Sequence, residues 1–306
     1  MKLKGYTLAA LAAAAYGTNP AFAVPLYEQG LNPNSVLLLR YVAGVPLVAA
    51  IALGRGQSLR VGSKQLMLLA LLGILMALSS LALFASYELM NAGIASTLLF
   101  IYPVLVAMLM VCFFHERFTP STALCLAVMG AGLALLFQPS EGAEISATGC
   151  IIIFCSALLY AVYIVLIKAS PSISSVPTST MLFYVLLTGS LLFAVLIPFG
   201  NPLILPTDAA GWSYVAALAL IPTVISLWCT TAAIQLIGST PTAIFGALEP
   251  VNAVILSVFA LGQPITPTEI CGGVLIILAT TLVVVQEPVN RALNRVRRLF
   301  PRRHHA

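Results

Sequence analysis

Long apolar runs alternate with short polar or proline-containing intervals along the whole chain. A helix that crosses a bilayer needs roughly 20 predominantly apolar residues, and ten runs approach or reach that length. Breaking residues such as Asn32-Pro33 and Thr119-Pro120 separate neighbouring runs. The pattern predicts ten transmembrane helices over residues 3–23, 33–53, 66–88, 93–114, 120–137, 147–168, 177–198, 211–235, 239–261 and 267–286.

The composition supports this interpretation and excludes several classes of protein. Of the 306 residues, 60% are hydrophobic and only 8% are charged, with a mean hydropathy of +1.06. Ordinary soluble domains carry about a quarter charged residues. The chain lacks the polar surface of a soluble enzyme, a nucleic-acid-binding protein or a disordered scaffold. We expect an all-α integral membrane protein in contact with the lipid bilayer.

The first apolar run allows a second interpretation. Lys2 and Lys4, an apolar stretch and Ala21-Phe22-Ala23 resemble a secretory signal peptide with its cleavage site. Removing this segment would interrupt the internal repeat described next. We therefore favour a first transmembrane helix.

The chain contains an internal repeat, which is best seen around two mid-helix prolines. Aligning Tyr102-Pro103 with Glu249-Pro250 without gaps pairs Glu116 with Gln263 and Thr119-Pro120 with Thr266-Pro267. An odd number of helices per copy gives the two copies opposite orientations, an arrangement common in transporters. The repeat predicts two inverted five-helix units, at 1–140 and 146–287, and a basic tail at 288–306.

The basic residues are concentrated on one side of the predicted helices. Lys and Arg favour cytoplasmic segments. If the chain crosses the membrane ten times, thirteen of its fourteen Lys and Arg residues lie in segments on the same side of the membrane. The loops on the other side carry acidic residues and no Lys or Arg. Both termini are therefore predicted to be cytoplasmic. The tail from Arg291 to Arg303 would anchor this topology, or would bind anionic lipid as well.

Two ionisable residues lie within predicted helices, where such residues are costly and often functional. Glu249 precedes Pro250 near the middle of the ninth helix. It could line a solute path or carry a proton, or it could be a buried structural residue, and the sequence leaves both open. Arg40 lies in the outer third of the second helix. It could snorkel outwards or pair with Glu28 or Glu88, and we favour a structural role.

Aromatic residues recur near the middle of the predicted helices, where a Tyr hydroxyl needs a hydrogen-bond partner. Each one could serve in packing, but together with Asn19 they predict an aromatic, weakly polar pocket. Pro103 and Pro250 would disrupt their helices and act as hinges. The predicted solute-binding residues are Tyr16, Asn19, Phe84, Tyr102, Tyr160, Tyr163, Trp228 and Glu249.

Other residues predict packing rather than chemistry. Gly130-Ala131-Gly132 and Gly272-Gly273, in the fifth and tenth helices, allow close helix contact. No helix carries His and carboxylates at metal-ligand spacing, and no phosphate-binding glycine loop with Lys occurs. The six cysteines are scattered and predict no disulfide framework. We expect neither an enzyme nor a cofactor.

The chain as a whole resembles the ten-helix EamA-like branch of the drug/metabolite transporter superfamily. The resemblance rests on Tyr16-Gly17-Thr18-Asn19, on Arg40, and on the paired patterns from Pro103 to Glu116 and from Pro250 to Gln263. The family usually has Glu where Gln263 stands, a change that we interpret as tolerated at a loop edge. The resemblance implies a bundle of inverted five-helix repeats around a central cavity, which helices one, three, four, six, eight and nine line. It also implies export of small metabolites or amino acids across a bacterial inner membrane.

The function expected from the sequence is secondary transport of small neutral or zwitterionic solutes by alternating access. Protons are a candidate coupling partner through Glu249. An anionic solute is disfavoured because the later helices carry no Lys or Arg except Lys168 at a helix end. The alternatives are a cationic-drug exporter that uses Glu249, and a channel, receptor or intramembrane enzyme. The sequence does not predict the oligomeric state.

Overall fold

The computed structural model describes residues 2–90, 92–116, 119–136, 146–199, 202–252, 255 and 266–299. Within these residues every regular element is helical. Seven described segments are long and apolar enough to cross a membrane. The protein is therefore a multi-pass membrane protein. The seven segments are Pro33–Gly54, Ser63–Ser86, Ile94–Phe114, Ala147–Ala169, Thr178–Phe199, Ala209–Ile237 and Pro267–Val284.

Several helices begin and end within a few residues of the predicted bounds because local signals fix their ends. Asn32 caps α3 (Pro33–Gly54) by accepting a 2.8 Å hydrogen bond from the Ser35 backbone N–H. Ser146 caps α8 (Ala147–Ala169) in the same way, through the N–H of Gly149. The other helices of this kind are α4 (Ser63–Ser86), α7 (Pro120–Leu136) and α10 (Thr178–Leu196), with short turns at α9 (Pro171–Ser174) and η1 (Ile197–Phe199).

The first predicted helix, 3–23, is in fact two helices. α1 (Lys2–Tyr16) ends before Gly17, and α2 (Asn19–Glu28) begins two residues later with a proline in its first turn. A Cβ at Gly17 would lie 2.7 Å from the backbone carbonyl oxygen of Glu249. The chain therefore breaks where only glycine allows a close approach to the second half.

The fourth and ninth predicted helices break at positions that the repeat alignment makes equivalent. α5 (Ala92–Leu99) and α6 (Tyr102–Phe114) are separated by residues 100–101, so Pro103 lies in the first turn of α6. α13 (Ser239–Gly246) is followed by a turn at Ala247 and a helical stretch over 248–252. We expected a kink at each proline. The break precedes the proline because the first turn of a helix does not need the missing N–H.

The eighth predicted helix, 211–235, contains a π-helical segment. α11 (Ala209–Leu218) leads into η2 (Ala219–Ile225), which contains Pro222, and then into α12 (Ser226–Ile237). The hydroxyl of Thr223 donates a 2.7 Å hydrogen bond to the Leu218 carbonyl. This bond satisfies the carbonyl that a proline without an N–H would leave unpaired in an α-helix.

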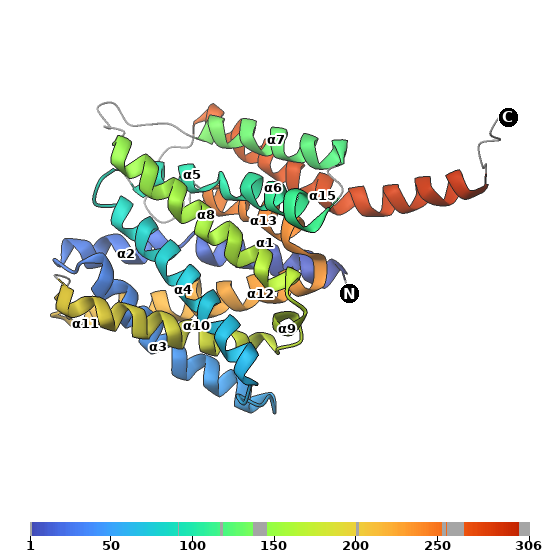
Figure 1. The fold of residues 1–306 in the computed structure, drawn as a ribbon. Helices are drawn as coiled ribbons and strands as arrows, with labels where there is room; N and C mark the ends of the chain where they lie inside the picture. The colour runs from blue at the N-terminus through green and yellow to red at the C-terminus, as the bar shows by residue number, and fades with distance from the viewer. Residues whose placement is uncertain are drawn as a thin grey trace.

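The helix contacts follow a two-fold pattern (Figure 1). α3 packs against α10, and α7 packs against α15 (Pro267–Leu299), so helices at equivalent places in the two halves meet. α1 packs against α12 and α13 just as α8 packs against α4 and α6. Exchanging the halves therefore maps these contacts onto each other, as expected for an internal repeat.

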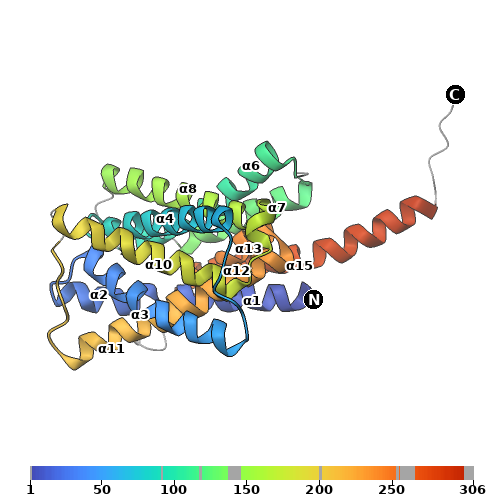
Figure 2. The same cartoon turned by 60° about the horizontal axis from the view of Figure 1, so that its bottom comes forward.

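The start of α1 and the end of α15 lie at the same end of the molecule (Figures 1 and 2). An even number of crossings predicts this placement. The helix α15 continues to Leu299, so the predicted tail at 288–306 begins inside a helix. Arg117, Gln263, Arg302, Arg303 and the predicted unit boundary at 140 lie outside the described residues.

The close packing expected of these glycines occurs at Gly132 and Gly272, where the fifth and tenth helices meet. A Cβ on Gly132 would lie 2.8 Å from the carbonyl oxygen of Gly272, and a Cβ on Gly272 would lie 2.7 Å from that of Gly132. The two backbones therefore pack directly against each other. Such contacts replace the hydrophobic effect as the source of helix association in lipid.

This contact predicts a position-specific loss of stability. Gly132→Leu would force α7 away from α15, and overpacking of this kind costs about 1–3 kcal/mol. Gly130→Leu is the matched control on the same helix, because a Cβ at Gly130 meets nothing within 4 Å. We expect a lower melting temperature in detergent for Gly132→Leu only. Equal melting temperatures for the two variants would contradict a tight contact at Gly132.

Candidate functional site

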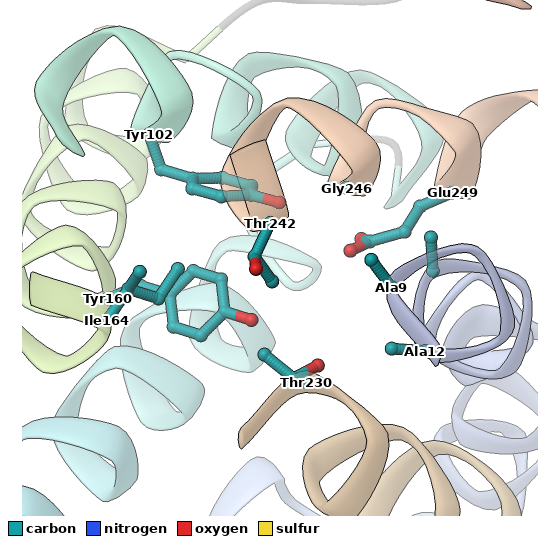
Figure 3. Close-up of a pocket in the computed structure, with 10 residues that line it drawn as sticks. Ala9, Ala12, Tyr102, Tyr160, Ile164, Thr230, Thr242, Gly246 and Glu249 are labelled. Atoms are coloured by element: carbon teal, nitrogen blue, oxygen red, sulfur yellow. The ribbon is translucent and has the colours of Figure 1, made fainter. Parts of the chain in front are cut away.

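A small pocket lies among α1, α6, α8, α12, α13 and the helical stretch at 248–252 (Figure 3). Both halves of the repeat contribute to its wall. The volume is about 10 Å³, which is room for about one water molecule. A solute as large as an amino acid would require the walls to move apart. The pocket is lined by Ala9, Ala12, Ala13, Tyr102, Tyr160, Ile164, Thr230, Thr242, Gly246 and Glu249.

Oxygen atoms from opposite walls point into this pocket (Figure 3). The ring centroids of Tyr102 and Tyr160 are 4.9 Å apart, with the rings edge to face at 66°. Thr242 donates its hydroxyl hydrogen to the Gly238 carbonyl at 2.7 Å, so towards the pocket its oxygen can only accept. The wall thus offers aromatic faces with a few hydroxyl groups.

Glu249 provides the one ionisable carboxyl group among the lining residues. Its side chain is 8% exposed, and the described lining residues include no Lys or Arg. A carboxyl group in such surroundings is stable when it is protonated or when a cation neutralises it. The arrangement can therefore bind a proton or the cationic group of a solute.

The position of Tyr102 depends on a glycine in the other half. A Cβ on Gly246 would overlap the Tyr102 hydroxyl group, so the phenol lies directly on the backbone of α13. Tyr102 and Glu249 are equivalent in the repeat alignment, and the structure brings both to one pocket. The equivalent breaks at 100–101 and 247 lie just before these two residues.

Three of the eight predicted binding residues line the pocket: Tyr102, Tyr160 and Glu249. Tyr163 lies behind Tyr160, with ring centroids 6.1 Å apart and the rings nearly parallel. Trp228 lies elsewhere. Its indole N–H donates to Ser179 at 3.0 Å, and its ring lies 4.6 Å from the guanidinium carbon of Arg55.

The other predicted residues gather around Arg40. Arg40 is 0% exposed and donates from Nη1 to Oδ1 of Asn19 at 2.9 Å. Its guanidinium carbon lies 5.1 Å from the centroid of the Phe84 ring. Of the two alternatives for Arg40, outward snorkelling is wrong because the side chain is buried, and the structure records no ion pair with Glu28 or Glu88, both of which are exposed. The guanidinium turns inward because the α1–α2 break presents Asn19 to it.

Sequence reasoning missed the small lining residues. Ala9, Ala12 and Ala13 share one face of α1, and Thr242 and Gly246 are one turn apart on α13. Spacings of three and four residues mark one helix face. This signal was available, but small residues on a face usually indicate helix packing and do not distinguish a pocket from a contact.

The model of the EamA-like transporter family matches residues 3–138 and again 147–285. The chain belongs to the EamA-like transporter family. The double match covers both copies of the repeat. No curated protein matches the sequence.

A solved structure described only as "Crystal structure of protein" shares the EamA-like fold. It superposes with a TM-score of 0.78 at 20% sequence identity, over 94% of this chain and 98% of that chain. At this identity the likeness supports the fold alone. In all, 29 chains of solved structures match.

The contact between Tyr102 and Gly246 predicts a sharp effect of a single methyl group. Gly246→Ala would push the phenol out of its position and change the pocket wall, at an overpacking cost of about 1–3 kcal/mol. We expect solute transport to fall by about tenfold or more, while the protein stays folded in detergent. Gly273→Ala is the control, because the nearest atom to a Cβ there is 3.8 Å away. Normal transport by Gly246→Ala would show that this contact does not shape the site.

Proposed function

We propose that the protein is a secondary transporter that exports small neutral or zwitterionic organic solutes, such as amino acids, across a bacterial inner membrane. It would cross that membrane ten times as two inverted five-helix repeats, with both termini in the cytoplasm. Membership of the EamA-like transporter family supports transport. The placement of the start of α1 and the end of α15 at one end of the molecule supports an even number of crossings.

The pocket between the two halves carries the proposal. It is aromatic and weakly polar, with one carboxyl group and, among its described lining residues, no basic side chain. Such a wall favours a solute with an apolar body and few polar groups. An anionic substrate such as a sugar phosphate would meet no opposite charge there.

Alternating access is the proposed mechanism, with the helix breaks as its hinges. The pocket has room for about one water molecule, so it must widen before a solute can enter. The breaks before Pro103 and Pro250 lie next to Tyr102 and Glu249. Bending at these breaks would move the two pocket residues together with the helices that carry them.

Proton coupling through Glu249 is a further part of the proposal. A buried carboxyl group without a basic neighbour in the pocket can exchange a proton for a solute when the path to one side opens. The same geometry supports a second candidate function, the export of cationic drugs. In that case the cationic group would pair with the Glu249 carboxylate.

Transport by the purified protein tests the main proposal. We expect reconstituted liposomes to take up at least one neutral amino acid from a panel of labelled amino acids faster than protein-free liposomes. A proton gradient of either sign should change the rate. Correctly folded protein that moves no member of the panel in either direction would contradict the proposal.

The role of Glu249 is tested by removing its charge without changing its size. We expect Glu249→Gln to transport neutral solutes independently of an imposed pH gradient, and to lose transport of organic cations. Glu88→Gln, at an exposed position, is the matched control and should behave like the wild type. Wild-type dependence on the pH gradient in Glu249→Gln would place the proton-coupling group elsewhere. If cation transport survived as well, the cation-exporter alternative would fail.

A further inference from the structure

Arg40 is buried with most of its hydrogen-bonding capacity unused. A guanidinium group has five N–H donors, and the structure gives this one a single hydrogen bond, from Nη1 to Asn19. Nε and Nη2 are buried and have no partner among the described residues. The rings of Tyr41 and Phe84 lie against the group, at 5.5 Å and 5.1 Å from its central carbon.

These neighbours do not neutralise the charge. An aromatic face stabilises a cation only weakly, whereas burying an unpaired charge is strongly unfavourable. The nearest acids along the chain, Glu28 and Glu88, are exposed and form no recorded ion pair with Arg40. The free N–H groups on Nε and Nη2 therefore suit an oxyanion that the described part of the chain does not supply.

The location of Arg40 favours an anion at the break in the first predicted helix. Asn19, its hydrogen-bond partner, is the first residue of α2. The start of a helix carries partial positive charge, and broken helices in transporters direct such ends at the anionic groups of substrates. The guanidinium group and the start of α2 thus present positive potential to the same place.

The same break is in contact with the second half of the chain. Gly17 contacts the backbone of Glu249, and Asn252 donates to the carbonyl of Ala14 at 2.7 Å. The break beside Arg40 is therefore packed against the helical stretch at 248–252, which contributes to the pocket wall.

We propose that Arg40 and Asn19 form a binding site for the carboxylate group of the solute. This inference rests on the proposed transport function and narrows its substrate class to organic solutes that carry a carboxylate group. The guanidinium group would bind the carboxylate through Nε and Nη2, in the two-pronged geometry that arginine favours.

Asn19→Asp tests the proposal because it changes one atom type and supplies the missing anion from the chain. The new carboxylate would pair with Arg40 and exclude the carboxylate of a solute. The probes are L-phenylalanine, L-tryptophan and L-leucine, each measured beside its carboxyl-free amine, in binding to purified protein and in liposome transport. We expect amino-acid binding to weaken on the order of tenfold or more, amine binding to persist, and the melting temperature to stay level or rise.

Arg40→Lys gives the same readout should Asn19→Asp fail to fold. Lysine keeps the charge but loses the two-pronged geometry. We therefore expect the binding of amino acids to weaken and the binding of amines to stay unchanged. Arg60→Lys, at an exposed position, is the matched control.

The outcomes separate the inference from the proposed function. If both site variants bind amino acids as tightly as the wild type does, the carboxylate role of Arg40 is overturned. It is also overturned if the variants bind amino acids and amines more weakly to the same extent. Equal transport of amino acids and amines by the wild type would also overturn it, while leaving the transport function standing. A wild-type protein that moves none of the solutes would overturn both.

Discussion

Hydrocarbon offers no hydrogen-bond partner to a peptide group, so a membrane protein can interrupt a helix only where other parts of the chain satisfy the freed groups. The interruption between α1 and α2 meets this requirement. The hydroxyl of Ser226 donates to the Ala12 carbonyl at 2.9 Å, Asn252 donates to Ala14 at 2.7 Å, and Thr18 donates to Ala15 at 2.7 Å. Two of these donors come from the second half of the chain. The break in the first half therefore exists only because the two halves are packed together.

The same constraint explains why the candidate site lies where it does. The breaks at 17–18, 100–101 and 247 all lie close to the residues that carry charge or hydroxyl groups: Glu249, Tyr102 and Asn19. Irregular backbone requires polar partners, and polar partners inside a membrane require an environment shielded from lipid. The region that tolerates interrupted helices is consequently the region that can hold a polar solute. The continuous pair α7 and α15, joined by Gly132 and Gly272, can instead pack closely without such partners.

The repeat gives the molecule its two-fold pattern of contacts, but the site departs from that pattern. Tyr102 and Glu249 occupy equivalent positions, and one carries a phenol while the other carries a carboxyl group. The equivalent of the interrupted first helix is α8, which is continuous from Ala147 to Ala169. A pocket between equivalent helices thus has walls of different chemistry. This difference allows one solute to be held in a defined orientation, because different groups of the solute can face the two halves of the chain.

The periodicity of apolar residues and the spacing of prolines determined a great deal without the structure. They gave the membrane location, most of the helix bounds, the repeat, the glycines that allow close helix packing, and three residues of the pocket: Tyr102, Tyr160 and Glu249. These features follow from local composition and from comparison of the chain with itself. The sequence also singled out Arg40 and Glu249 correctly as the two charges that require an explanation.

Only the tertiary structure decided how those residues are grouped. It separated Tyr16, Asn19 and Phe84, which lie around Arg40, from the pocket itself, and it placed Trp228 against Arg55. It also turned the expected proline kinks into breaks two or three residues earlier, and it directed Arg40 inward rather than towards the membrane surface. The physical reason is that each of these outcomes depends on a partner far away in sequence. Gly17 meets Glu249, Tyr102 meets Gly246 and Ala14 meets Asn252, and no local pattern encodes which of these distant groups will meet.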